Sequence, residues 1–438
     1  MPLPARYANE VPEMAELWEP RSTFRFQTRV WLAQCEARSQ LEGSPSPDDL
    51  ETIRAALELS DDDVAELTRA EGHETNRLLR LVQSRLTAAQ GNQIHRGNTS
   101  SDILDTALSL QLLEGLRLLD ADFAALEAAL EGLARRDRDT IQMSRTHGQH
   151  AVPHTFGRQV LGWLAEVRRA RQRLVRAGEV MAVGKLSGEV GTHVFIEAAL
   201  ESAALGRLGL RADEAPTQVI SRDRHAEVLS HLAVNASTLA RIATDISLLG
   251  ITDVGEVREP FDSGAQQGSS AMPHKRNTEL SERVRGLARR VHGAASEEVQ
   301  AAVLWLERDI SHSATERFAL PDAFGASAYM ARLLRFVVEN LVVDEHRMAA
   351  NVDATHGAIF GSRLLNALLD KGLTRTNAYE LVKGLAQCAL DEKVALIDLA
   401  KADPEVSRHL DPTELDVLFD PAFYLRHIDE AYRRLGLQ

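Results

Sequence analysis

The stretch LLEGLRLLDADFAALEAALEGL, residues 112–133, decides the fold of this chain. Apolar side chains recur in it at alternating steps of four and three residues, at Leu112, Leu116, Leu119, Phe123, Leu126, Leu130 and Leu133. Residues 228–249 repeat the alternation at Val228, Leu232, Asn235, Leu239, Ile242, Ile246 and Leu249. An average step of about 3.5 residues is typical of helices that pack side by side along an apolar seam. We therefore expect a bundle of long helices with both seams in its core.

Prolines indicate how far such helices can extend. Beyond residue 20 they stand at 45, 47, 153, 216, 260, 273, 321, 404, 412 and 421. Because a proline inside a helix costs about 3 kcal/mol, long helices are expected in the long intervals between these positions. Aromatic residues, which favour strands, make up only 5% of the chain. The sequence therefore predicts an all-α fold.

Length and local composition predict three domains. At about 150 residues per domain, a chain of 438 residues suggests roughly three units. Gly, Asn and Ser gather in residues 91–101, ahead of the first seam, and a second boundary is expected near residue 350. We expect an N-terminal helical domain over residues 1–98, a central long-helix bundle over residues 99–351 and a C-terminal helical domain over residues 352–438.

Charge and composition exclude several classes of function. The net charge of −14 argues against a nucleic-acid groove, which must neutralise phosphates with excess Lys and Arg. No stretch approaches the roughly 20 apolar residues of a membrane span, and the first residues do not resemble a signal peptide. The two cysteines, Cys35 and Cys388, are far apart in the sequence, which fits a protein of a reducing compartment better than one held together by disulfides. We expect a cytoplasmic protein that gathers basic side chains locally if its ligand is anionic.

Four polar stretches interrupt the helical pattern and carry the candidate chemistry. They are HRGNTSSD (95–102), SRTHGQHAVPHTFG (144–157), GAQQGSSAMPHKRN (264–277) and ERDISHSATER (307–317). Glycines and a proline in the third stretch predict a loop, which carries Ser269, Ser270, Lys275 and Asn277. Hydroxyl groups beside a basic cluster suit the capture of an anion. The alternative is a solvated hinge whose charges have no ligand.

The second stretch contains three histidines in the pattern H-x2-H-x3-H, at 147, 150 and 154. Such a pattern can bind a metal ion, but Pro153 interrupts the helix that would align the rings, and no cysteine or carboxylate stands nearby. A single histidine that acts as a general acid is better motivated, because its ordinary pKa near 6.5 suits proton transfer at neutral pH. We therefore expect no metal site here.

Side chains would have to hold a bound phosphate, because the sequence contains neither a P-loop nor a G-x-G-x-x-G fingerprint. Arg308, Ser313 and Arg317 are the candidates. Ser313 and Arg317 are four residues apart and share one face if this segment is helical, and guanidinium groups bind phosphate through two hydrogen bonds. The alternative is an exposed helix start laced with ion pairs.

The sequence GSSAMPHKRN at 268–277 closely resembles the signature loop of the fumarase/aspartase superfamily. Over nearly its whole length the chain is similar to the adenylosuccinate lyase family in particular, through TSSD at 99–102, RTHG at 145–148 and ERDISHS at 307–313. The resemblance implies an all-α subunit of three domains with a signature loop at 261–278. It further implies a homotetramer whose long helices form a central bundle, with active sites built from several subunits and with no metal or cofactor.

The activity implied by the resemblance is a β-elimination that splits a C–N bond in a succinyl-substituted amine and releases fumarate. Such a reaction needs a base, donors that stabilise a doubly charged intermediate, and an acid for the leaving nitrogen. By resemblance, Ser269 is the base and His147 is the acid. Glu282 is then the charge partner of His147, while Lys275 and Asn277 bind the succinyl carboxylates.

The resemblance also implies a set of substrate contacts and the substrate itself. The matching positions are Arg6, Tyr7, His73, Thr99, Ser100, Thr146, Gln218, Ser270, Arg283, Arg308, Ser313 and Arg317. The expected reactions convert adenylosuccinate to AMP and fumarate, and SAICAR to AICAR and fumarate, in purine biosynthesis. The sequence departs from the family pattern at Gly72, His73, Glu74 and Thr75, where many members carry a basic residue followed by His-Asp-Val. The alternatives are a lyase that releases fumarate from another N-substituted aspartate and a helical scaffold without activity.

Overall fold

The computed structural model describes residues 4–261, 272 and 274–437, so Ser269 and Ser270 lie outside the described residues. Two compact units make up the chain. Unit 1 consists of Met1–Leu126, Val167–Arg241 and Arg283–Leu334, and unit 2 consists of Glu127–Glu166, Ile242–Glu282 and Arg335–Gln438. Each unit is therefore assembled from three separate segments of the sequence.

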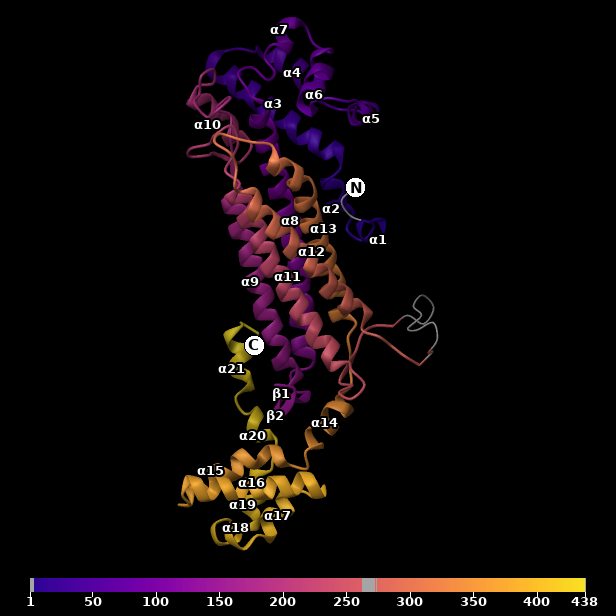
Figure 1. Cartoon of the computed structure of the whole chain (residues 1–438), viewed down its shortest axis with the longest axis vertical. Helices are drawn as coiled ribbons and strands as arrows, with labels where there is room; N and C mark the ends of the chain where they lie inside the picture. Colours follow the sequence, from indigo (N-terminus) through magenta and orange to yellow (C-terminus); the bar gives the residue numbers. More distant parts are fainter. Residues whose placement is uncertain (1–3, 262–271, 273, 438) are drawn as a thin grey trace. The chain divides into compact units, whose positions relative to one another are not determined.

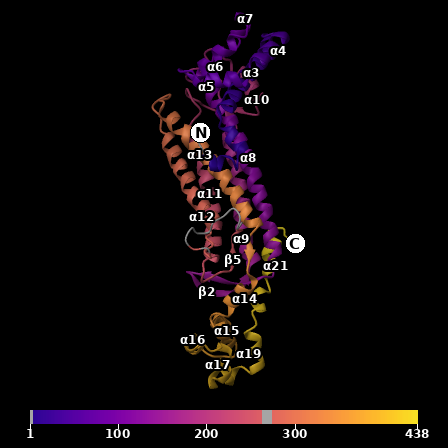
Figure 2. The ribbon, with the colours of Figure 1, turned by 90° about the vertical axis from the view of Figure 1, so that its right-hand side faces the viewer.

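Five long helices supply residues to both units. They are α8 (Ser100–Arg136), α9 (Phe156–Met181), α11 (Asp223–Leu249), α12 (Glu279–Ala301) and α13 (Ser311–Glu339). Within unit 1 their segments run side by side (Figures 1 and 2). The predicted all-α class and the predicted bundle of long helices are thus confirmed.

Both predicted seams are buried along their whole length. No seam residue of α8 is more than 4% exposed, and none of α11 is more than 7% exposed. Asn235, the polar residue in the seam of α11, has hydrogen-bond partners on α9: its Nδ2 donates to the carbonyl of Ala170 at 3.2 Å, and its Oδ1 accepts from Nε of Arg173 at 2.6 Å. These bonds remove most of the cost of burying an amide in an apolar seam.

One proline does not end a helix as the sequence analysis expected. Pro321 lies inside α13, which continues to Glu339. Its neighbours Leu320, Ala323 and Phe324 are almost completely buried. Their packing outweighs the hydrogen bond that the proline removes, which is how tertiary contacts commonly override local helix propensity.

One further long helix, α3, and several short helices make up the rest of unit 1. They are α1 (Ala5–Ala8), α2 (Pro12–Leu17), α3 (Pro20–Glu42), α4 (Pro47–Ala56), α5 (Asp61–Arg69), α6 (Glu74–Gln83), α7 (Ala88–Gly91) and α10 (Ala198–Arg207). Several begin with proline at the first helical position, where its missing N–H costs nothing. Two short strands, β3 (Val183–Gly184) and β4 (Arg211–Ala212), pair in parallel.

Unit 2 contains the longest strands of the described chain. β1 (Ile141–Thr146) and β2 (Gln149–Thr155) form an antiparallel hairpin, and β5 (Val257–Arg258) pairs with β6 (Val342–Val343). The hairpin contacts α14 (Glu345–Asp353). After a short turn of 3-10 helix, η1 (Ala358–Phe360), the remaining helices are α15 (Gly361–Asp370), α16 (Arg375–Glu392), α17 (Leu396–Ala402), α18 (Pro404–His409), α19 (Pro412–Leu418), α20 (Ala422–Leu425) and α21 (Ile428–Arg434).

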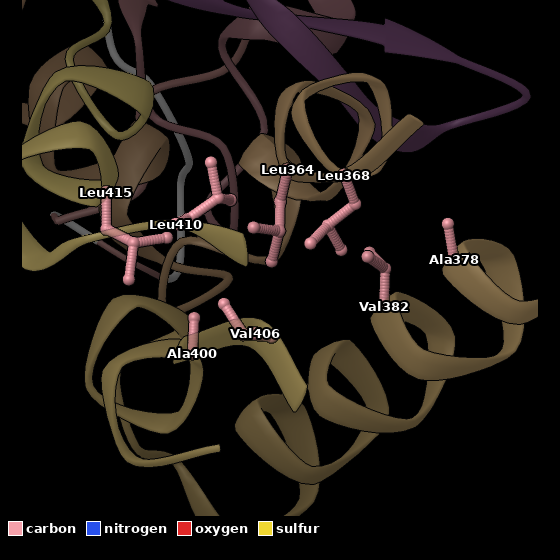
Figure 3. Packing of buried hydrophobic residues seen from close by; sticks show 8 residues of the cluster. All are labelled: Leu364, Leu368, Ala378, Val382, Ala400, Val406, Leu410 and Leu415. Atoms are coloured by element: carbon pink, nitrogen blue, oxygen red, sulfur yellow. The ribbon is translucent and has the colours of Figure 1, made fainter. Parts of the chain in front are cut away.

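The helices α15 to α19 have a core of their own, shown in Figure 3. Its buried members are Leu364, Leu368, Ala378, Val382, Ala400, Val406, Leu410 and Leu415. The border between the two compact units runs through the long helices and does not test the domain boundaries expected at residues 98 and 351. Those boundaries stay a prediction. In the part of the chain that the structure describes, no helix is both long and apolar enough to cross a membrane.

Candidate active site

His147 lies at the tip of the β1–β2 hairpin in unit 2. Because Thr146 pairs with Gln149, the connecting loop consists of His147 and Gly148 alone. Both residues are left-handed, with φ of 53° and 78°, which is the geometry of a tight type I′ turn. A histidine in this region costs about 1 kcal/mol, so the hairpin imposes the conformation. The segment was expected to be polar and non-helical, but its two strands were not predicted. His-Gly between the strands resembles the Asn-Gly signal of such turns.

The other two histidines of the H-x2-H-x3-H pattern are more buried than His147. Burial lowers the pKa of His154 to about 4, helped by the nearby charge of Arg158. Burial also lowers the pKa of His150, with Arg145 adding to the effect. Among the described residues, no three His, Cys, Asp or Glu side chains come together as metal ligands.

Lys275, Asn277 and Glu282 lie at the start of α12, also in unit 2. Lys275 and Asn277 are exposed in the segment before the helix, and Glu282 is exposed in its first turn. Glu259 anchors this helix start, because its carboxylate accepts the backbone N–H of Leu280 at 3.0 Å and of Ser281 at 2.7 Å. No hydrogen bond or ion pair joins His147 to Glu282 within the described residues.

A cavity of about 280 Å³ in unit 1 gathers three of the predicted phosphate contacts, Arg308, Ser313 and Arg317. Ser313 and Arg317 lie on α13, so residues 311–317 are helical although the sequence placed them in a stretch expected to interrupt the helical pattern. Nη1 of Arg308 donates to Oε1 of Gln218 at 3.1 Å, which brings a fourth predicted residue beside them. Nε of Arg308 is buried and finds no hydrogen-bond acceptor in the described part of the chain.

Arg222 also lines this cavity, but its charge is already compensated. It donates to both carboxylate oxygens of Asp105, at 2.6 and 2.9 Å, and to Glu316 at 2.8 Å. Although burial opposes it, the guanidinium holds the pKa of Asp105 below its usual range. Burial raises the pKa of Glu316 above its usual range. Among the described residues, Arg308 is therefore the cavity arginine without a carboxylate partner, and Arg317 has only a distant one, Glu74 at 3.9 Å.

Two further side chains of the cavity had been given no role by the sequence analysis. Glu74 accepts a hydrogen bond from Nε2 of Gln27 at 2.7 Å and lies 3.9 Å from Nη1 of Arg317. His312 is almost completely buried, and its Nδ1 has no partner among the described residues. Burial, with Arg222 nearby, lowers the pKa of His312 to about 4, so the ring is neutral at pH 7. Glu74 belongs to the departure at residues 72–75, positions that the family resemblance implies lie at the substrate. His312 stands inside ERDISHS, and no pattern indicated that it faces the cavity.

Tyr7 and Arg283, two predicted substrate contacts, meet at a third side chain of unit 1. The ring of Tyr7 packs edge-on against Tyr329 with 4.8 Å between centroids. Nη1 of Arg283 donates to the hydroxyl of Tyr329 at 2.8 Å. Arg6 precedes Tyr7 on α1. Tyr329 therefore fixes where both predicted contacts lie.

His73, Thr99 and Ser100 lie at helix starts of unit 1. His73 is exposed and stands immediately before α6, and Ser100 is the first residue of α8. The backbone N–H of Thr99 donates to Asp102 at 2.8 Å. Asp102 is itself buried and paired with Lys185. Burial raises the pKa of Asp102 to about 6, against the opposing effect of Lys185.

The sequence of this chain matches known protein families and proteins. A family model described as "Lyase" matches residues 5–293, and one described as "Adenylosuccinate lyase C-terminus" matches residues 357–435. The adenylosuccinate lyase of Synechocystis sp. is 42% identical over 430 residues, which cover 98% of this chain and 99% of that protein. The chain belongs to the adenylosuccinate lyase family.

Solved structures with the same fold belong to proteins with other names. A fumarate lyase from Mesorhizobium sp. BNC1 matches with a TM-score of 0.88 and 28% identity, over 98% of each chain. A 3-carboxy-cis,cis-muconate lactonizing enzyme from Pseudomonas putida matches with a TM-score of 0.86 and 30% identity, over 97% of this chain and 96% of that one. Because one fold occurs with differently named enzymes, the reaction has to be argued from the site.

Proposed function

We propose that this chain is a lyase of purine biosynthesis that cleaves adenylosuccinate to AMP and fumarate, and SAICAR to AICAR and fumarate. The cavity of unit 1 carries the proposal. Arg308, Ser313 and Arg317 line it with two guanidinium groups and a hydroxyl, donors that suit the phosphate of a nucleotide. The buried Nε of Arg308 lacks an acceptor among the described residues, so a bound phosphate would satisfy a donor that is costly to leave unpaired.

The elimination assigns one task to each catalytic residue. Ser269, as the alkoxide, takes the Cβ proton of the succinyl group, and the electron pair of that C–H bond forms an aci-carboxylate. Lys275 and Asn277 bind the succinyl carboxylates, and the charge of Lys275 stabilises the intermediate. When the electrons return to form the double bond of fumarate, the C–N bond breaks and His147 protonates the departing nitrogen. None of these steps requires a cofactor or a metal ion.

The site is proposed to be completed by other copies of the chain in a cytoplasmic homotetramer. His147 and Glu282 are not joined within the described part of one chain, so we assign the charge partner of His147 to a neighbouring subunit. Large apolar side chains on unit 1 support association, because 67–96% of each is exposed at Val303, Trp305, Leu306, Ile310 and Phe318. Exposed apolar groups of this size mark an interaction surface. Light scattering of the purified chain tests the tetramer.

Fumarate release by the purified chain tests the activity. Adenylosuccinate, SAICAR, argininosuccinate and other N-succinyl amines are assayed in parallel. Rapid turnover of both purine substrates supports the proposal. A much higher kcat/KM for a non-purine amine would instead support the alternative lyase, which releases fumarate from another N-substituted aspartate. The carboxylate of Glu74 favours that alternative, because a negative charge in the cavity repels a phosphate. If a folded tetramer eliminates fumarate from none of these substrates, the alternative of a helical scaffold without activity would be supported.

A further inference from the structure

Glu256 is a buried carboxylate of unit 2, and its side chain is completely inaccessible. Its Oε1 accepts hydrogen bonds from Nη2 of Arg145 and Nδ2 of Asn351, each at 2.7 Å. Its Oε2 accepts from Nη1 of Arg145 at 3.1 Å and from Nε2 of Gln142 at 2.9 Å. Four donors thus satisfy both oxygens, and the two-pronged contact with Arg145 offsets the cost of burying the charge.

The backbone of Glu256 is fixed as well as its side chain. Its N–H donates to the carbonyl of Leu249, at the end of α11, at 2.9 Å. Its carbonyl accepts from the N–H of Asp344, immediately before α14, at 3.0 Å. Strand β5 begins at the next residue, and the side chain of Glu256 reaches residues of β1 and α14. Glu256 is therefore a fixed point to which a neighbouring strand can be tied.

The residues tied to Glu256 lie on either side of a bulge in β1. The register of the hairpin shifts between Met143 and Arg145. Oγ of Ser144, in the bulge, donates to the carbonyl of Val152 at 2.6 Å and accepts from its N–H at 3.2 Å. A bulge changes where the following side chains point. By holding Gln142 before the bulge and Arg145 after it, Glu256 clamps the part of β1 that leads into the turn at His147.

We propose that Glu256 is a positioning residue that, through Gln142 and Arg145, fixes the turn presenting His147 to the leaving nitrogen. The inference rests on the proposed function, because the position of His147 affects the rate only if His147 protonates the leaving nitrogen. His147 occupies a left-handed conformation that it does not favour by itself, so its placement depends on the strands beneath it. A displacement of about 1 Å at a reacting group can cost about a hundredfold in rate. Glu256 matters in this way without touching a reacting atom.

Glu256→Gln tests the clamp, because it removes the charge and turns one acceptor into a donor that faces other donors. We expect kcat to fall about ten- to a hundredfold while KM changes less than about twofold. Hydrogen exchange of residues 141–155 should accelerate in the same variant. Arg145→Lys, which keeps the charge but loses the two-pronged contact, should show smaller changes of the same kind. The double variant should lose little more than Glu256→Gln alone, because both changes break one contact.

Val382→Ala is the matched control for lost stability. It opens a cavity among α15 to α19 (Figure 3), and it should lower Tm without changing kcat or exchange in the hairpin. Wild-type kcat in Glu256→Gln, or an equal loss of kcat in Val382→Ala at matched Tm, would overturn the inference. If the wild-type chain releases no fumarate, the proposed function fails first. The clamp is then judged by exchange alone, and unchanged hairpin exchange in Glu256→Gln would refute it.

Discussion

Arg308 is paired with the neutral amide of Gln218, at 3.1 Å, rather than with a carboxylate. Its neighbour Arg222, on the same cavity, is matched by Asp105 and Glu316. A guanidinium whose strongest described partner is neutral retains its attraction for an anion. From this difference we propose that Arg308 binds the substrate and that Arg222 supports the cavity wall.

Replacing Arg308 by Gln is expected to raise KM for adenylosuccinate about ten- to a hundredfold, with a smaller effect on kcat. A charge-assisted hydrogen bond contributes about 1.5–3 kcal/mol, and a phosphate remote from the reacting bond is held equally in ground and transition states. Steady-state kinetics measures the effects on KM and kcat separately. Arg408→Gln, which removes an exposed arginine of α18, serves as control and should leave both constants unchanged. An unaltered KM in Arg308→Gln would disprove the phosphate contact.

Glu74→Gln is expected to lower KM for phosphate-bearing substrates several-fold. The carboxylate lies 3.9 Å from Arg317 and must compete there with the phosphate. Glu74→Asp, which retains the charge, is the matched comparison and should change KM much less. Competitive inhibition by AMP measures the same effect without catalysis. Weaker AMP binding by Glu74→Gln would show instead that the carboxylate orients the arginine for the ligand.

His147→Ala is expected to lower kcat about 10²- to 10⁴-fold while the helical circular dichroism stays unchanged. The reason is loss of the acid that protonates the leaving nitrogen. Wild-type turnover in His147→Ala would remove this histidine from the mechanism.

Mixing His147→Ala with Ser269→Ala tests whether sites are shared between chains. After the subunits have exchanged, some sites should draw both intact residues from different chains, and activity should reappear. Each variant incubated with itself is the control. Persistent inactivity, in mixtures where subunit exchange is demonstrated, would argue for a site within one chain.

Glu298→Gln is expected to stabilise the protein at pH 8 and to have little effect near pH 4.5. Burial, with Glu316 nearby, raises the pKa of Glu298 from 4.5 to about 8, and neither of its oxygens has a partner within the described residues. Between these two pH values the unfolded chain releases a proton that the folded chain keeps. The free energy of unfolding of the wild type therefore falls as pH rises through this window, and glutamine, which does not titrate, removes that loss.

Thermal unfolding at several pH values checks this prediction. Each 1 kcal/mol of stability corresponds to about 2–4 °C in Tm for a unit of this size. Glu51→Gln, at an exposed position of α4 away from Glu298, is the control and should have the same Tm as the wild type at both ends of the range. A gain in Tm that is equal at pH 4.5 and pH 8 would show that ionisation of Glu298 is not its cause.

The sequence predicted those features that repeat or that stand in a local motif. The seam residues of α8 and α11 could be read from their spacing, because burying one helix face requires that period. The helical start of α13 at Ser311 was not predicted, because the polar stretch 307–317 lacks the apolar period of the seams. The β1–β2 hairpin was missed, since its polar strands show no simple alternation. Burial of Glu256 was missed as well, because all four of its side-chain hydrogen bonds join residues at least 95 positions away in the sequence. No local pattern indicates such distant partners.

The border between the two units has a consequence for how this chain can change over evolution. The chain crosses that border after residues 126, 166, 241, 282 and 334, and every crossing falls inside one of the five long helices. A recombination event or engineered fusion at such a point would join two half-helices of different origin, whose seams need not be in phase. Neither unit can therefore be exchanged as a module, and inherited variation must accumulate by substitution and in the loops.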